Sequence, residues 1–100
     1  MARGVYKGEL ADLIADGAML VDVRESFEHD LDNSLPGHTH VPLSKLKDLR
    51  AKLTSARPVI FYCRSGLLSF QAAEIAGSWT SQPVYYLAGG LVNYIAEDNV

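Results

Sequence analysis

A run of four β-forming apolar residues, Val59 to Tyr62, leads directly into the only cysteine of the chain, Cys63. A continuous apolar run of this kind predicts a strand that is buried on both faces of a sheet. After a short loop that contains Gly66, the pattern over residues 67–78 predicts a helix. We therefore expect Cys63 where a central strand ends and a helix begins, which is where open α/β sheets place their ligand sites.

The position of Cys63 favours a reactive thiol. The first backbone N–H groups of a helix have no partner within the helix, and the helix dipole adds positive potential at that end. Arg64 places a positive charge beside Cys63, and Gly66 gives the loop the backbone freedom that a tight anion cradle requires. These surroundings favour the thiolate, which is the nucleophilic form of cysteine. A buried, inert cysteine is the alternative that position alone leaves open.

Apolar runs and turn residues divide the rest of the chain into alternating elements. Strands are expected near residues 5–6, over 19–23, within 38–41 and over 83–87. Helices are expected over 8–16, over 27–31 with Ser26 as its cap, over 44–53 with Ser44 as its cap, and over 91–96. Strands that alternate with helices predict an α/β fold, with a parallel sheet, helices on both faces and right-handed crossovers.

Four segments of the chain together resemble the signatures of the rhodanese family. The stretch Cys63-Arg64-Ser65-Gly66-Leu67-Leu68-Ser69 is similar to the active-site loop of that family, usually Cys-x-x-Gly-x-Arg-Ser/Thr. Three further segments resemble the other family signatures and occur in the family's order: Asp22-Val23-Arg24-Glu25 at a strand end, Leu35-Pro36-Gly37 through Val41-Pro42-Leu43, and Leu87-Ala88-Gly89-Gly90-Leu91.

The resemblance implies a fold and an activity. The implied fold is the three-layer rhodanese-like fold, with a central parallel sheet of about five strands, in a single domain over residues 1–100. The implied activity is that of a thiosulfate:cyanide-type sulfurtransferase. Cys63 would take a sulfane sulfur from thiosulfate or a persulfide donor and pass it to a thiol or cyanide acceptor by two displacements. The expected partners are a small sulfur donor and a thiol acceptor, with a persulfide-carrying protein as a further candidate.

The resemblance also implies roles for particular residues. The loop residues after Cys63 would bind the substrate: Arg64, Ser65, Gly66, Leu67, Leu68 and Ser69. Asp22 and Arg24 would support the site from the neighbouring strand end, with Asp22 paired to Arg64 so that the loop is fixed. The alternative for Asp22 and Arg24 is a surface ion pair, which would contribute only about 0–1 kcal/mol.

Two departures from the family pattern bear on the activity. Leu68 stands where the family loop usually carries an arginine, so the site has one positive charge fewer and should bind the thiosulfate dianion weakly. The segment 32–37 is one residue longer than usual, and Ser34 stands near the position of a family histidine. Both departures keep open a second function, that of a catalytically weak protein-binding or regulatory module.

Other cysteine chemistries fit the sequence less well. A protein-tyrosine phosphatase loop would need an arginine six positions after the cysteine, where Ser69 stands. A thioredoxin-like dithiol would need a second cysteine at position 66. Arsenate reduction on the same fold stays open, without an additional motif to support it.

A metal site and a macromolecular surface are not expected. His38 and His40 would share one face of a strand, and Cys63 or His29 could join them around zinc. Such a site needs a third or fourth ligand, and there is no further cysteine, so we expect no metal and no cofactor. The net charge of −3 without a basic run argues against nucleic-acid binding. No stretch is long enough to span a membrane and no signal peptide is visible, so a cytoplasmic location is expected.

Overall fold

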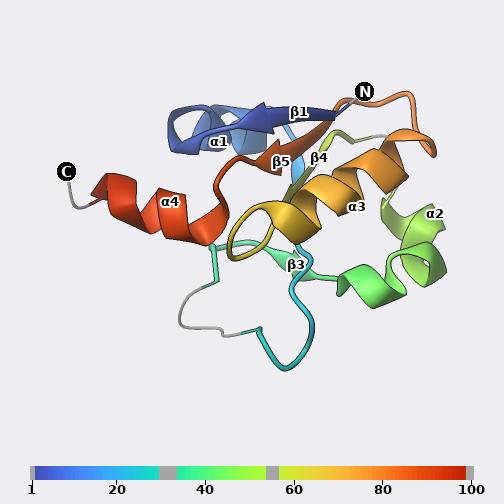
Figure 1. The fold of residues 1–100 in the computed structure, drawn as a ribbon. Coiled ribbons are helices and arrows are strands. Elements are labelled where there is room, and N and C mark those ends of the chain that lie inside the picture. Colours follow the sequence, from blue (N-terminus) through green and yellow to red (C-terminus); the bar gives the residue numbers. More distant parts are fainter. Residues whose placement is uncertain (1, 30–33, 54–56, 99–100) are drawn as a thin grey trace.

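The computed structural model describes residues 2–29, 34–53 and 57–98. Within these ranges, five strands form one sheet in the order β1-β5-β4-β2-β3, and every neighbouring pair is parallel. The strands are β1 (Ala2–Val5), β2 (Met19–Asp22), β3 (Thr39–His40), β4 (Val59–Tyr62) and β5 (Val84–Leu87). The expected parallel α/β architecture is confirmed, and β4, the apolar run before Cys63, lies in the middle of the sheet (Figure 1).

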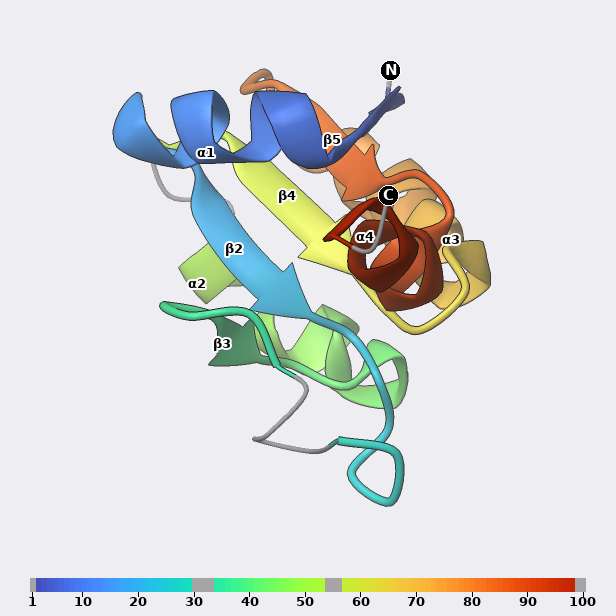
Figure 2. The same ribbon diagram turned by 90° about the vertical axis from the view of Figure 1, so that its left-hand side faces the viewer.

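Helices cover both faces of the sheet, as the alternation of elements predicts (Figure 2). On one face, α1 (Lys7–Ala15) and α4 (Gly90–Asp98) contribute Leu10 and Leu91 to a core cluster that also holds Ile60 and Tyr62. On the other face, α3 (Leu67–Gly77) contributes three buried alanines to the cluster that holds Phe61 and Cys63. Small side chains on α3 allow this helix to lie close to the sheet.

The register of the central strands decides which side chains meet. Asp22 pairs with Tyr62 across β2 and β4, and Val21 pairs with Phe61. Because successive residues of a strand point to opposite faces, Tyr62 and Cys63 lie on opposite sides of the sheet. The carboxyl ends of β2 and β4 therefore carry two separate groups of polar and reactive residues, one on each face.

Two expected helices differ in the structure. The segment predicted as one helix over 44–53 consists of two 3₁₀ turns, Leu43–Lys45 and Lys47–Leu49, followed by the single turn α2 (Arg50–Leu53). Ser44 does not cap a helix, because its amide and its hydroxyl both donate to the carboxylate of Glu25, at 3.1 and 2.9 Å. The amides that follow bond three residues back, as in 3₁₀ geometry.

The second difference is the segment after Arg24. The predicted helix over 27–31 is a turn over residues 26–28, closed by amides of Glu28 and His29 that donate to the carbonyl of Glu25. Phe27 is 88% exposed, so it provides no apolar contact that could hold a helix against the sheet. The last two residues of this prediction, 30 and 31, lie outside the described residues. None of the helices in the described segments has the length and apolar character needed to cross a membrane.

Candidate functional site

Cys63 lies in the loop between the end of β4 and the start of α3, as the sequence predicts. Figure 1 shows this loop in yellow, leading into α3. The backbone amide of Gly66 donates to the Cys63 sulfur at 3.1 Å, and the amide of Ser69 donates to it at 3.4 Å. The thiol itself lies 3.5 Å from the hydroxyl oxygen of Ser69, to which it can donate. Two amides from the first turn of a helix therefore point at one sulfur atom, an arrangement that stabilises negative charge there.

The shape of this loop depends on Gly66 and Ser69. Gly66 has a φ of 96°, in the left-handed region that other L residues adopt only with strain. The hydroxyl of Ser69 donates to the carbonyl of Gly66 at 3.1 Å and closes the first turn of α3. This conformation directs the Gly66 amide back toward Cys63.

A pair of glycines from a distant part of the sequence supports the loop. The turn at Gly89 and Gly90 lies directly against the Cys63 loop, and the amide of Leu91 donates to the carbonyl of Cys63 at 2.9 Å. A Cβ on Gly90 would lie 2.4 Å from the carbonyl oxygen of Arg64. The sequence predicts only a tight turn at Gly89-Gly90; the contact with the reactive loop requires the fold.

The loop residues divide into an outer and an inner group. Arg64, Ser65 and Leu67 are exposed to solvent, whereas Ser69 is fully buried and Cys63 is only 1% exposed. Leu68 is half-buried and packs against the core cluster that contains Cys63. Because the thiol is covered in this conformation, a reactant reaches the sulfur only when the surrounding side chains shift.

Asp22 pairs with Arg24 and not with Arg64, so the expected Asp22–Arg64 pair is wrong. The guanidinium of Arg24 holds the carboxylate in a fork, with Nη2 at 2.7 Å from Oδ2 and Nε at 3.1 Å from both oxygens. The amide of Arg24 donates to the same carboxylate at 2.9 Å. Arg24 is only two residues from Asp22, so little chain entropy is lost when the two side chains pair. Arg64, by contrast, is exposed on the neighbouring loop.

The Asp22–Arg24 pair is buried and is not the surface pair considered as the alternative. Its side chains are 0% and 6% exposed. Burial alone would raise the pKa of Asp22, but the hydrogen bonds and charge of Arg24 outweigh it, and the pKa of Asp22 is lowered. Arg24 also donates to the hydroxyl of Ser34 at 3.0 Å, which ties Ser34 to the end of β2; residues 32 and 33 of the segment that departs from the family pattern lie outside the described residues.

Tyr62 occupies the face of the sheet opposite Cys63. Its hydroxyl accepts a hydrogen bond from the amide of Leu35 at 3.1 Å. Burial raises the pKa of Tyr62 to about 12, and the neighbouring negative charge of Asp22 adds to this effect. The neutral phenol is therefore part of the packing that holds the segment at Leu35 against the sheet.

The three histidines lie close together beside the Asp22–Arg24 ion pair. The rings of His29 and His40 stack with centroids 3.8 Å apart, and the Nε2 atoms of His29 and His38 are 3.0 Å apart. Burial, followed by the nearby His40, lowers the pKa of His29. The sequence predicts that His38 and His40 share one strand face, but β3 begins at Thr39. Among the described residues, His38 and His40 each contact His29, and neither contacts Cys63.

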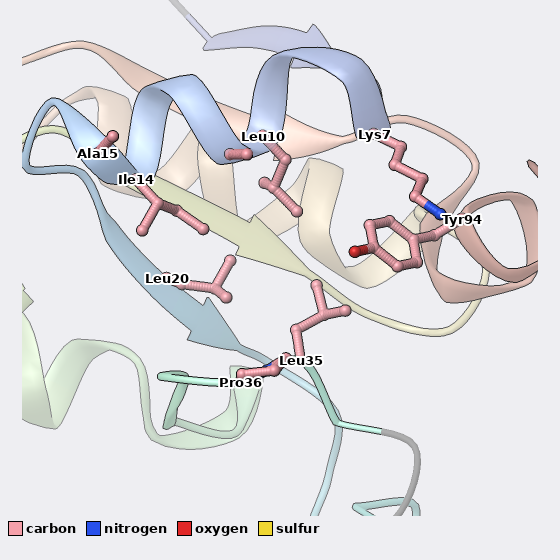
Figure 3. Close-up of a pocket in the computed structure, with 9 residues that line it drawn as sticks. Lys7, Leu10, Ile14, Ala15, Leu20, Leu35, Pro36 and Tyr94 are labelled. Atoms are coloured by element: carbon pink, nitrogen blue, oxygen red, sulfur yellow. The ribbon is translucent and has the colours of Figure 1, made fainter. Parts of the chain in front are cut away.

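An apolar cavity of about 450 Å³ lies on the α1 face of the sheet (Figure 3). Leu10 and Ile14 of α1, Leu20 of β2, and Leu35 and Tyr94 point into it. No residue of the Cys63 loop lines this cavity. The cavity and the candidate catalytic cysteine are therefore separate features of the described chain.

Comparisons with known proteins agree with this geometry. The family model described as Rhodanese-like domain matches residues 7–97. The Bacillus subtilis protein YqhL, described as uncharacterized, is 34% identical over 73 residues, which are 73% of this chain and 57% of that protein. The chain thus spans little more than half the length of this curated relative.

Solved structures give the same result. The rhodanese homolog TT1651 from the extremely thermophilic bacterium Thermus thermophilus is 31% identical, with a TM-score of 0.71 over 91% of this chain and 99% of that one. The human single-domain sulfurtransferase TSTD1 is 25% identical, with a TM-score of 0.78 over 97% of this chain and 98% of that one. Both neighbours are similar to this chain over nearly their whole length.

Proposed function

We propose that this chain, which belongs to the rhodanese-like domain family, is a sulfurtransferase that carries a sulfane sulfur on Cys63. The observation that carries the proposal is the pair of amides, from Gly66 and Ser69, that donate to the Cys63 sulfur. The similarity to a human single-domain sulfurtransferase supports the same reaction class. No other cysteine in the sequence could carry the sulfur.

The reaction proceeds by two displacements. The Cys63 thiolate attacks the outer sulfur of the donor, a new S–S bond forms, and the donor's S–S bond breaks. The donor leaves with the electron pair, as sulfite from thiosulfate or as a thiolate from a persulfide. A thiol or cyanide then attacks the outer sulfur of the Cys63 persulfide, and the Cys63 thiolate is the leaving group. Loop amides stabilise the negative charge before and after each displacement.

The loop chemistry suggests a donor of low charge. Leu68, in place of the usual arginine, directs an apolar side chain toward the core, and Arg64 is exposed at the outer side of the loop. A dianion such as thiosulfate therefore meets less positive charge than in the usual family loop. We favour a persulfide donor, either a small molecule or a persulfide-carrying protein, and we place the reaction in the cytoplasm, where thiol acceptors are kept reduced.

The burial of Cys63 favours a second candidate, a protein-binding or regulatory module with little catalysis. A thiol that is 1% exposed reacts slowly unless the loop opens. The two candidates differ in turnover. A sulfurtransferase releases many acceptor products per protein molecule, whereas a module releases none above background.

The test is a turnover assay with a low-molecular-weight persulfide as donor and cyanide as acceptor, followed by thiocyanate formation. We expect multiple turnovers for the wild-type protein and background rates for Cys63→Ser. Equal rates for both proteins would contradict the proposal. If thiocyanate forms only at background rate with the wild-type protein, the module becomes the better description.

A further inference from the structure

Three side chains that take no part in the two displacements proposed for Cys63 converge at the end of β2. A carboxylate oxygen of Asp22 and ring nitrogens of His29 and His38 all lie within 4.8 Å of one another. Two imidazoles and one carboxylate form a donor set that zinc and the neighbouring divalent transition metals prefer. We propose that this cluster binds a divalent metal ion of the zinc class, with His29, His38 and Asp22 as its protein ligands.

His38 is already oriented as a metal ligand. Its Nδ1 lies 2.9 Å from the carbonyl oxygen of Leu35, and because a carbonyl only accepts, Nδ1 carries the proton. The lone pair of neutral His38 is then on Nε2, the atom that faces His29. Metal-binding histidines characteristically donate their other ring nitrogen to a carbonyl or carboxylate in this way, which fixes the tautomer and the ring orientation.

The other two ligands are also held in place. The ring of His29 stacks on His40 with an interplanar angle of 6°. Asp22 is anchored by the fork of Arg24, and its Oδ2 lies 3.9 Å from Nε2 of His29. His40 cannot be a fourth ligand through Nε2, because this atom donates to the carbonyl of Arg24 at 2.7 Å.

Metal binding requires only small adjustments. The Nε2 atoms of His29 and His38 are 3.0 Å apart, with His29 donating to the lone pair of His38, whereas two nitrogens on a tetrahedral zinc ion lie about 3.3 Å apart. Binding of the ion would move the proton of His29 from Nε2 to Nδ1 and draw Asp22 inward, and water would complete the coordination. The guanidinium of Arg24, 2.7 Å from Asp22, opposes the added positive charge, so we expect weaker binding than at a closed four-ligand site.

This site is independent of sulfur transfer. Asp22 is in register with Tyr62, and Tyr62 belongs to the core cluster on one face of the sheet, while Cys63 belongs to the cluster on the other. Metal binding should therefore persist in a protein that cannot form a persulfide, so the two proposals can fail separately.

The experiment is a titration of EDTA-treated protein with Co²⁺, followed by its visible absorption bands. We expect one equivalent to bind to the wild-type protein and to Cys63→Ser, without a thiolate-to-metal charge-transfer band. His29→Gln and His38→Gln should each weaken binding at least about tenfold. His40→Phe is the matched control: it removes both ring nitrogens of His40 but keeps an aromatic ring on which His29 can stack, so it should retain the site.

Three results would overturn the proposal: no Co²⁺ binding by the wild-type protein, binding that survives both His29→Gln and His38→Gln, or binding that is lost in Cys63→Ser. A measurement on unmodified protein guards against variants that fail to fold. Addition of Zn²⁺ should shift the ring resonances of His29 and His38 in NMR spectra. Unchanged resonances of both rings at saturating Zn²⁺ would contradict the assignment.

Discussion

Gly90 lies so close to the carbonyl of Arg64 that a Cβ on Gly90 would be 2.4 Å from its oxygen. The same Cβ would be 2.7 Å from the amide nitrogen of Gly66, which donates to the sulfur of Cys63. Gly90 also has a φ of 65°, in the left-handed region. The start of α4 and the reactive loop therefore fit together only without a side chain at this position.

The variant Gly90→Ala should lose both stability and sulfur loading. We expect an unfolding free energy lower by at least about 1–2 kcal/mol from the left-handed backbone alone, with the backbone clash adding to this. Chemical denaturation and polysulfide loading measure the two effects. Gly77→Ala is the control, since a Cβ there meets nothing within 4 Å and the change should stay below about 1 kcal/mol. Equal behaviour of the two variants would contradict the described contact.

The buried pair of Asp22 and Arg24 should make the single variants less stable than the double variant. Arg24→Met leaves an uncompensated buried carboxylate, and we expect a loss of about 3–5 kcal/mol in unfolding free energy. Asp22→Leu with Arg24→Met removes both charges and should recover much of that loss. Urea denaturation of the wild type, the single variants Asp22→Leu and Arg24→Met, and the double variant measures the coupling. A double variant as unstable as the sum of its singles would show that the pair is not coupled as described.

Tyr62 should make the fold less stable at high pH. Its folded pKa of about 12 lies above the ordinary value near 10, so the neutral form is favoured in the folded state. Its contribution is fully present below pH 10 and is lost as the pH rises from 10 to 12, by about 2–3 kcal/mol in total. Urea denaturation at several pH values should show this decline in wild type, and a smaller decline in Tyr62→Phe. If the unfolding free energies of wild type and Tyr62→Phe fell in parallel with pH, the predicted contribution of Tyr62 would be excluded.

Leu68 should limit the use of thiosulfate. Leu68→Arg restores the positive charge of the usual family loop, and one charge-assisted hydrogen bond corresponds to a gain of about tenfold or more in kcat/KM with thiosulfate and cyanide. Leu67→Arg is the matched control, because it adds the same charge at a neighbouring side chain that is 63% exposed. No gain for Leu68→Arg, or an equal gain for both variants, would count against this explanation of donor choice.

The sequence predicts the central features because local patterns determine them. The four apolar residues of β4 are all buried, as an uninterrupted run of β-formers requires of a central strand. Gly66 does adopt the left-handed conformation that the loop needs, and α3 begins at Leu67 as predicted. These features depend on residues close in the chain, where backbone preferences and strand burial decide the outcome.

The remaining features depend on contacts that a linear pattern does not contain. Asp22 pairs with Arg24 because this arginine is two residues away and buried beside the carboxylate, whereas Arg64 is exposed to solvent on the neighbouring loop. The helix predicted from Ser44 does not form as one element. The amide and the hydroxyl of Ser44 both donate to the carboxylate of Glu25, nineteen residues earlier, so Ser44 does not cap a helix. The approach of Gly90 to the loop requires packing between elements far apart in the sequence.

The central claim is that the amides of the loop make Cys63 a sulfur carrier, and intact-mass spectrometry tests it most directly. After reaction with inorganic polysulfide and removal of excess reagent under non-reducing conditions, the wild-type protein should carry the mass of one added sulfur atom. Dithiothreitol or cyanide should remove that sulfur, and Cys63→Ser should carry none. An unmodified wild-type mass, or an equal adduct on Cys63→Ser, would contradict the account.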